Sequence, residues 1–214
     1  MTHSHKYTEN LCCMTLILMS VLSLMGCSVT EPRRSGGRAY MLDVERSDRQ
    51  YQCALAGRMR TRPCHVARPY SGRGLVYRLT DVEYEQDGGR HFLVPLDDQL
   101  TALMRCWFQC PMTGDSAPHT APTPYILDAY LTALMADFTV DPPMVRASMV
   151  FSLERRVSGR GQTVFEKGYQ HAIPVEPRPH AHQVVSTMSD CIEHILIDLE
   201  KDLSDPNLVQ MDGK

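Results

Sequence analysis

Cysteine and histidine side chains near the carboxyl-terminal end form the best candidate for a metal site in this sequence. Cys191 and His194 lie three residues apart in a segment of helical periodicity, and His180 and His182 precede them. A zinc site of the usual kind needs a second Cys/His pair at comparable spacing, and the sequence has none. The competing interpretation, surface histidines beside a helix-flank thiol, is therefore favoured. We expect no metal or other cofactor.

Motifs for phosphate binding and nucleophilic catalysis are also missing. There is no G-x-x-x-x-G-K-[ST] loop, and the segment GRGQT (159–163) lacks the lysine that would reach a phosphate. Ser71 in PYSGRG lacks the preceding glycine of a G-x-S-x-G elbow and is interpreted as a turn serine. Asp137, Asp141 and Glu154 are dispersed carboxylates, interpreted as solvated loop and edge charges. The chain is accordingly expected not to be an enzyme.

Cys27 stands at the end of the only strongly apolar run of the chain. That run, LCCMTLILMSVLSLM at positions 11–25, is shorter than the roughly 20 apolar residues of a membrane-spanning helix. It has the length of a secretory signal core. An amino-terminal core helix with an incidental cysteine, or an ordinary signal peptide, are the alternatives to lipid attachment at Cys27.

The four residues LMGC (24–27) resemble a bacterial lipobox. The resemblance implies that residues 1–26 are a removable lipoprotein signal peptide and that Cys27 becomes the acylated mature amino terminus. Each buried methylene contributes about 0.8 kcal/mol, so several acyl chains hold a domain on a membrane almost permanently. Ser28 resembles the outer-membrane sorting choice. Residues 27–37, which include EPRRSGGR, are expected to be a flexible tether.

Charge and cysteine content limit the partners and the covalent links. The 214 residues carry a net charge of -3, a mild imbalance that argues against nucleic acid as a partner. Export implies an oxidising compartment, in which cysteines can pair. Five cysteines follow Cys27, and this odd number leaves at least one of them unpaired within the chain. The open alternatives are a Cys106–Cys110 link, a Cys53–Cys64 link, or buried thiols that pack as small apolar side chains, Cys191 among them.

Periodicity predicts an α+β fold, a single mixed or antiparallel sheet packed by two amphipathic helices. Strands are expected at about 38–44, at two segments joined by a turn at Asp87-Gly88-Gly89, and at an alternating pair that follows residue 144. Apolar residues of that pair share faces: Val145, Ala147, Met149, Phe151 and Leu153 on the first strand, and Phe165, Tyr169 and Ile173 on the second.

Two helices complete the predicted fold. The first begins near Asp97 or Asp98 and carries one apolar stripe: Leu100, Leu103, Met104, Trp107 and Phe108. The second, from about 181 to 203, should lie on the sheet. Residues 125–138 fit a helix about as well as a buried strand.

Two segments resemble a known family. RPYSGRGLVYRL (68–79) and PYILDAYLTALMADFTVDPPMVRASMVFSLE (124–154) are similar to the ABC-type transport auxiliary lipoproteins, the PqiC-like group associated with membrane integrity. The order of features supports the resemblance: lipobox, YMLDV strand, GRGLVYR, helix, long strand, hairpin and closing helix. The resemblance implies that 125–138 is a strand, that 38–205 form one auxiliary lipoprotein domain, and that 206–214 are a disordered tail.

The family resemblance also implies a function. The chain would be a non-enzymatic lipoprotein of the outer membrane, anchored by its acyl chains and facing the periplasm. Its partners would be an ABC permease and an MCE-domain protein that bridges the periplasm in a lipid transport system. In such a system the chain could also assemble as a homo-oligomer, for example a ring of copies. The alternatives are a regulatory lipoprotein that activates a cell-wall synthesis enzyme, and a periplasmic hydrolase or metal-binding protein.

Arg73, Tyr77 and Arg78 in GRGLVYR are the candidate contact residues for the partner protein or a lipid headgroup. Arginine beside an aromatic residue is common at protein interfaces. The alternative is the plain start of a strand after a turn at Gly72 and Gly74, in which Tyr77 and Arg78 face opposite sides.

Overall fold

The computed structural model describes residues 37–45, 55, 58–109, 125–157 and 160–204. The chain divides into two compact units, Met1–Gly36 and Gly37–Lys214. All described residues belong to the second unit, and the fold is that of the second unit alone. Cys27 lies outside the described residues, so its lipidation stays a prediction.

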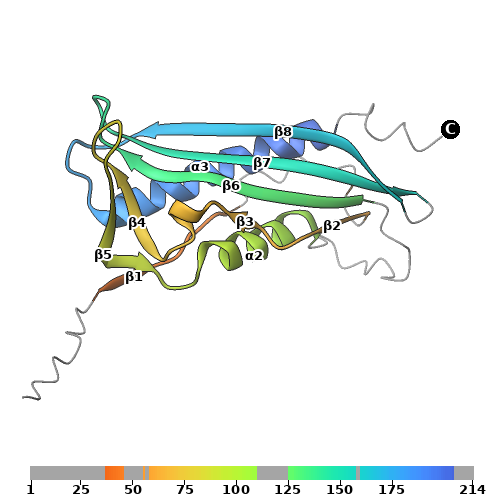
Figure 1. Ribbon diagram of the computed structural model, residues 1–214, viewed down its shortest axis with the longest axis horizontal. Coiled ribbons are helices and arrows are strands. Elements are labelled where there is room, and N and C mark those ends of the chain that lie inside the picture. The colour runs from red at the N-terminus through yellow and green to blue at the C-terminus, as the bar shows by residue number, and fades with distance from the viewer. Residues whose placement is uncertain (1–36, 46–54, 56–57, 110–124, 158–159, 205–214) are drawn as a thin grey trace, which may run out of the picture. The chain divides into compact units, whose positions relative to one another are not determined.

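Among the described residues, eight strands form a single mixed sheet in the order β1-β5-β4-β6-β7-β8, and β2 and β3 pair additionally with β6 (Figure 1). Their bounds are β1 Arg38–Tyr40, β2 Met59–Thr61, β3 His65–Val66, β4 Gly74–Arg78, β5 Tyr84–Phe92, β6 Tyr125–Asp137, β7 Met144–Val157 and β8 Arg160–Pro174. Together with two helices, the sheet confirms the predicted α+β class. The strand at 125–138, which the pattern left open and the family resemblance implied, is β6.

One edge of β6 is covered by three short strands in succession. Met59 of β2 lies opposite Tyr125, His65 of β3 opposite Tyr130, and Tyr77 of β4 opposite Ala136, and all three strands run parallel to β6. The sequence pattern predicted neither β2 nor β3, because strands of two or three residues are too short to show alternation.

The strand β7 has one buried face and one half-buried face. Its alternate residues Val145 to Leu153 are fully buried, whereas the intervening residues Arg146 to Ser152 are only half-buried. Successive side chains of a strand point to opposite faces. The predicted half-buried strand and its partner β8 are therefore confirmed, with Met149 opposite Tyr169.

Two described helices, α2 (Leu96–Gln109) and α3 (Ala181–Leu203), cover the buried face of the sheet. The helix α3 packs along β7 and β8, as Figure 1 shows, and α2 packs against β2 and β3. The predicted stripe of α2 is confirmed, since Leu100, Met104, Trp107 and Phe108 are buried and Leu103 is half-buried against the same core. Full burial of each large apolar side chain contributes about 1.5–3 kcal/mol relative to exposure, so these two helices supply much of the core.

The hairpin between β4 and β5 turns at a different place from the one predicted. Its turn lies at 79–83, where the Leu79 N–H donates to the Glu83 carbonyl at 2.9 Å and the Glu83 N–H donates to Thr80 Oγ1 at 3.0 Å. Residues 87–89 lie inside β5 and form an irregularity, because Gly74 pairs with His91 but Val76 pairs with Gln86.

The side chain of Asp87 explains why Asp87-Gly88-Gly89 bends without reversing the chain. Its Oδ1 accepts hydrogen bonds from the N–H groups of Gly89 and Arg90, both at 2.9 Å. These bonds satisfy backbone donors locally, as aspartate often does in bends. The glycines serve a bulge in the strand, and the predicted turn position was wrong.

The predicted first strand is also shorter than expected, since β1 ends at Tyr40. Beyond it, the Leu42 N–H donates to Oε1 of Gln99 at 2.8 Å, and the Asp43 N–H donates to Oγ of Ser189 at 3.0 Å. The backbone of 41–45 thus leaves the sheet because side chains of α2 and α3 satisfy its donors.

Candidate partner-contact surface

The face of β6, β7 and β8 turned away from the two helices is called the open face. Along β7 it presents Ser148, Val150 and Ser152, side chains that are small and half-buried. Across β6 it presents Asp128 and Tyr130, whose ring side chain is 44% exposed. Near the end of β6 the short 3-10 helix Arg68–Tyr70 packs on this face, where Tyr70 and Val76 bury Met135. In the described part of the chain, α2 and α3 lie on the other face, and Tyr130 stays exposed.

A shallow hollow of about 580 Å³ lies on the open face. Its lining residues come from β3, β6, β7 and β8: His65, Asp128, Ala129, Tyr130, Val150, Ser152 and Glu166. The register places Asp128 opposite Ser152 and Ser152 opposite Glu166, so the two carboxylates flank a serine on the middle strand. Its polar groups alternate with an aromatic ring and a valine, a composition suited to binding.

Asp137 is a buried carboxylate at the end of β6, where the sequence analysis expected a solvated charge. It is 1% exposed. Arg146 Nε donates to its Oδ2 at 2.8 Å, and Nη1 of Arg78 lies 3.5 Å from the same oxygen. Thr139 donates to Oδ1 from its N–H at 3.0 Å and from its hydroxyl at 2.6 Å. The Asp-x-Thr spacing of 137 and 139 was the sequence signal for these two hydrogen bonds from Thr139.

These contacts determine the charge state of Asp137. Burial alone would raise the pKa of the carboxyl, but the hydrogen bonds from Thr139 and Arg146 favour the ionised form and hold its pKa below the ordinary value. An ionised carboxylate then links two strands that flank β6, since Arg78 belongs to β4 and Arg146 to β7.

The three residues predicted as partner contacts do not form one surface. Tyr77 follows Leu75 on the helix-covered side and packs against Phe138, with ring centroids 6.1 Å apart. Burial, and then the charge of Asp87, raises the pKa of Tyr77. Arg78 points to the opposite side beside Asp137, and Arg73 is exposed before β4 begins. Their role in partner contact stays a prediction.

Arg78 is the best placed of the three for a structural role. Besides Asp137, it pairs with Asp81 at 3.1 Å, and its guanidinium lies 6.0 Å from the centre of the Tyr84 ring. Its Nε is buried and has no hydrogen-bond partner within the part of the chain that the structure describes. Arg78 therefore joins the hairpin to β6 and retains one unsatisfied donor.

The four candidate metal residues do not come together in the structure, although the rings of His180 and His182 stack with centroids 5.7 Å apart. Cys191 is fully buried in the core, where its thiol donates to the Val145 carbonyl at 3.6 Å and burial raises its pKa to about 12. His194 is exposed and lies beside His171, with ring centroids 5.3 Å apart. In the described ranges no group of three His, Cys, Asp or Glu side chains could hold a metal ion.

The remaining cysteine alternatives are partly decided. Cys64 is a buried free thiol whose pKa burial raises to about 12, so the Cys53–Cys64 link is wrong. Its N–H donates to Thr101 Oγ1 at 2.8 Å, which fixes it against α2. Cys110 lies outside the described residues, and the Cys106–Cys110 alternative therefore stays open.

A polar seam between β8 and α3 was missed by the sequence analysis. His171 Nε2 lies 2.9 Å from Asp198 Oδ2, Lys167 Nζ lies 2.7 Å from Asp202 Oδ2, and the Tyr169 hydroxyl donates to the same carboxylate. The available signal was the spacing in the sequence: Lys167, Tyr169 and His171 are two residues apart, as in a strand, and Asp198 and Asp202 are four apart, as on one face of a helix. Burial opposes ionisation, but these partners lower the pKa of both Asp198 and Asp202.

Comparison with solved structures identifies the fold. Protein XCC0632 from Xanthomonas campestris, a DUF330 protein, matches with a TM-score of 0.63 at 16% identity, over 82% of this chain and 98% of its own. The chain shares the fold of this DUF330 protein. An uncharacterised protein matches with a TM-score of 0.52 at 18% identity, over 72% of this chain and 97% of its own.

Other comparisons add no function. No family model matches the chain, and no curated protein does. A lipoprotein from Neisseria meningitidis, GNA1162, reaches a TM-score of only 0.26 at 9% identity, over 64% of this chain and 96% of its own, which is too low to support an inference. Within the described residues, no helix has both the length and the apolar character needed to cross a bilayer.

Proposed function

We propose that the chain is an outer-membrane lipoprotein that serves, without catalysing a reaction, as the auxiliary component of an ABC/MCE-type lipid transport system. In this proposal Cys27 carries the acyl chains, and the folded unit that begins at Gly37 faces the periplasm. It docks the periplasm-spanning MCE-domain protein, the partner of the ABC permease, to the outer membrane, and so supports membrane integrity.

The order of the elements supports the proposal best. The strand β1, the GLVYR strand β4, the helix α2, the long strand β6, the β7–β8 hairpin and the closing helix α3 follow one another along the chain. This is the order that the resemblance to the auxiliary lipoproteins implied. Because one fold can host many functions, the proposal needs a test of the partners themselves.

The open face supplies the docking surface in this proposal. It carries the hollow beside Tyr130 and, farther along the same face, the ion pairs of Asp137 with Arg78 and Arg146. Protein interfaces commonly combine an exposed aromatic residue with arginines and satisfied polar groups. A partner that covers this face would bury Tyr130, the largest exposed ring of the hollow.

The partners are tested by affinity capture of the full lipoprotein from crosslinked envelopes, with mass spectrometry as the readout. We expect an MCE-domain protein and its permease to be recovered, and to be lost or weakened when Cys27→Ser removes the acyl anchor. The neighbouring substitution Ser28→Ala is the matched control, since it leaves the cysteine in place. Recovery of a cell-wall synthase in place of these partners would overturn the proposal.

A further inference from the structure

The side chains of the hollow on the open face form a grid of two rows across β6, β7 and β8. The register sets one row as Asp128, Ser152 and Glu166, and the next row as Tyr130, Val150 and Gly168. Neighbouring strands lie about 4.8 Å apart and alternate residues of a strand about 7 Å apart, so the grid measures roughly 10 Å by 7 Å. The hollow is therefore wide enough to take one long side chain.

The floor of the hollow is low because its residues are small. Val150 and Ser152 are half-buried, and Gly168 has no side chain. A Cβ at Gly168 would meet the Cγ2 atom of Val150 at 3.9 Å, an ordinary contact distance. The space above Gly168 is thus open to a ligand, and a substitution can fill it without disturbing the core.

Two side chains stand on opposite sides of this floor. The ring of Tyr130 on β6 is 44% exposed, and Glu166 on β8 is exposed. Within the described residues, neither side chain makes a hydrogen bond, an ion pair or a ring contact. The hollow thus presents an aromatic face and a carboxylate, both available to another molecule.

The other carboxylate of the hollow, Asp128, is already neutralised. Its Oδ2 lies 2.7 Å from Nη1 of Arg62, which also lies 3.3 Å from Glu154. Arg60 stands opposite Ile126, in the row beyond Asp128. Both arginines lie on the side of β6 that faces away from β7 and β8, so they are separated from Glu166 by two strands.

The cation nearest to Glu166 along the chain is committed to the other face of the sheet. Lys167 points toward α3, where its Nζ lies 2.7 Å from Oδ2 of Asp202 and 5.0 Å from the centre of the Tyr169 ring. Successive residues of a strand face opposite sides. Glu166 is therefore the carboxylate of the hollow that has no cation beside it in the described part of the chain.

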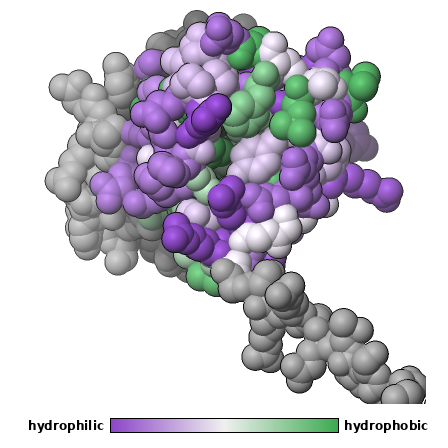
Figure 2. All heavy atoms as spheres, turned by 90° about the vertical axis from the view of Figure 1, so that its left-hand side faces the viewer, coloured by the Kyte–Doolittle hydropathy of each residue, from purple (hydrophilic) through white to green (hydrophobic). Residues whose placement is uncertain are grey.

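The end of the sheet that carries the β4–β5 turn offers no comparable pair of groups. Its exposed apolar side chain Val82 lies between the acidic residues Asp81 and Glu83. Figure 2, which views the molecule from this end, shows hydrophobic residues separated by hydrophilic ones. The exposed ring here, Tyr84, already has the guanidinium of Arg78 6.0 Å from its centre. In the hollow, the same kind of ring has no such neighbour.

We propose that the hollow receives an arginine side chain of the protein that docks on the open face. A guanidinium above Val150 and Gly168 would stack on Tyr130 and donate hydrogen bonds to Glu166. Arginine suits this pair of groups better than lysine, because its planar fork both stacks on rings and matches carboxylates.

The shallowness of the hollow favours a protein as the source of this side chain. Sites for free small molecules bury most of the ligand surface, which a shallow hollow on a flat sheet does not do alone. A docked protein surrounds the side chain that it inserts and excludes water from its rim. The inference rests on the proposed function for its setting and deepens it, because it names the chemistry of the partner's contact.

Methyl NMR of the full lipoprotein in neutral phosphatidylcholine nanodiscs tests the inference. With valine methyl groups labelled, Val150 reports on the floor of the hollow, and Val82, which is 90% exposed outside it, is the internal comparison. The probes are N-acetyl-arginine amide and N-acetyl-citrulline amide, which has nearly the same shape but no charge. We expect the arginine amide to shift the Val150 signals and not those of Val82, and the citrulline amide to shift neither.

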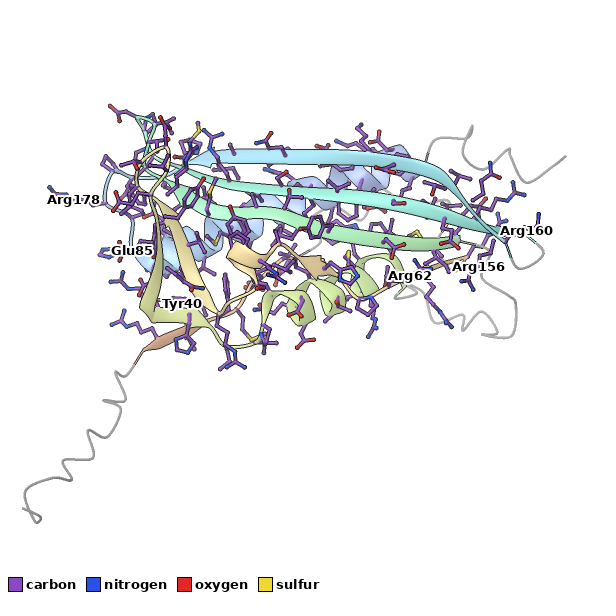
Figure 3. All side chains as sticks on the ribbon, viewed as in Figure 1. Tyr40, Arg62, Glu85, Arg156, Arg160 and Arg178 are labelled. Atoms are coloured by element: carbon purple, nitrogen blue, oxygen red, sulfur yellow. The ribbon has the colours of Figure 1, made fainter. Side chains whose placement is uncertain are left out.

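Three variants locate the effect. Glu166→Gln should raise the dissociation constant of the arginine amide about fivefold, the size of one exposed ion pair. Glu85→Gln is the matched control and should leave it unchanged, because Glu85 is also an exposed strand residue but lies at the end of the sheet opposite Arg62 in Figure 3. Gly168→Ile fills the hollow with a side chain that strands favour. It should abolish the shift without lowering the melting temperature.

Several outcomes would overturn the inference. These are equal shifts of Val150 and Val82, equal responses to the two probes, or equal weakening by Glu166→Gln and Glu85→Gln. A response to phosphoethanolamine at lower concentration than to the arginine amide would assign the hollow to a lipid headgroup. If the arginine amide binds as expected but affinity capture recovers no MCE-domain protein, the inference stands and the proposed function fails. Capture of that protein without a response to the arginine amide would give the reverse.

Discussion

Nε1 of Trp107 in α2 donates a hydrogen bond of 3.1 Å to Oε2 of Glu200 in α3. Both residues are buried, and Glu200 is only 2% exposed. The bond joins the two helices beneath the sheet. It therefore ties α2 to α3, the two helices that pack on the side of the sheet opposite the open face.

Trp107→Phe should lower the free energy of unfolding by about 2 kcal/mol, because it removes a donor from a buried carboxylate. Chemical denaturation followed by circular dichroism measures the change. Tyr130→Phe is the matched aromatic control, since that ring lies in the hollow and is 44% exposed. A loss for Trp107→Phe no larger than that for Tyr130→Phe would show that the bond does not stabilise the fold.

Asp137→Asn should destabilise the protein at neutral pH by about 3 kcal/mol, because one partner of a buried ion pair is removed. Asp81→Asn is the control, since the Asp81 side chain is 91% exposed and its pair with Arg78 lies at the surface. Surface pairs contribute at most about 1 kcal/mol. Equal effects of the two substitutions would contradict the assigned burial of Asp137.

The contribution of Asp137 should also depend on pH. Its pKa is lowered in the folded state, so its stabilisation is present above the unfolded pKa of about 3.9 and is lost as the pH falls through the folded value. The difference in unfolding free energy between the wild type and Asp137→Asn should therefore shrink below about pH 4. Asp198 and Asp202 also have lowered pKa values and add to the acid sensitivity. Both are present in the wild type and in the variant, so their contribution cancels in the difference between the two unfolding free energies.

Gly74→Ala should destabilise the β4–β5 pair. A Cβ at this position would lie 2.8 Å from the Asp87 carbonyl oxygen, a backbone atom at the bulge. Overpacking of this kind costs about 1–3 kcal/mol. Gly88→Ala is the matched control, because a Cβ there would meet nothing within 4 Å. The account of the bulge is wrong if thermal melting shows the two variants to be equally stable.

Cys64 and Cys191 should resist alkylation in the native protein. Burial raises the pKa of both thiols to about 12, so almost no thiolate forms at pH 8. Peptide mapping after iodoacetamide treatment of reduced protein should find both unmodified, and modified once denaturant is added. Cys106, an exposed residue, is the internal comparison. Rapid modification of Cys191 without denaturant would place it outside the core.

The long elements of this fold were predictable from the sequence. The alternation from Val145 to Leu153 and the helical stripe of 181–203 extend over several periods, so the pattern determined both the type and the buried face. Turn position was less predictable: the glycines after Asp87 suggested a reversal, but side-chain hydrogen bonds made them a bulge. The true turn at 79–83 contains no glycine.

The candidate surfaces depended on register, which the sequence could not supply. Tyr130, Val150 and Glu166 stand far apart in the sequence, and only the pairing of β6 with β7 and of β7 with β8 brings them to one hollow. Asp137 likewise meets Arg146 only because β6 and β7 pair antiparallel. Tyr77 and Arg78 were expected on opposite faces, and the structure confirms this alternation.

Photocrosslinking in intact cells tests most directly whether the open face docks the periplasm-spanning component. p-Benzoylphenylalanine replaces Tyr130 in the hollow, and in a parallel strain it replaces Leu93, which is 55% exposed outside the hollow. The account predicts a crosslink from position 130 to an MCE-domain protein, and none from position 93. Equal crosslinks from both positions, or a crosslink from position 130 to a cell-wall synthase, would contradict it.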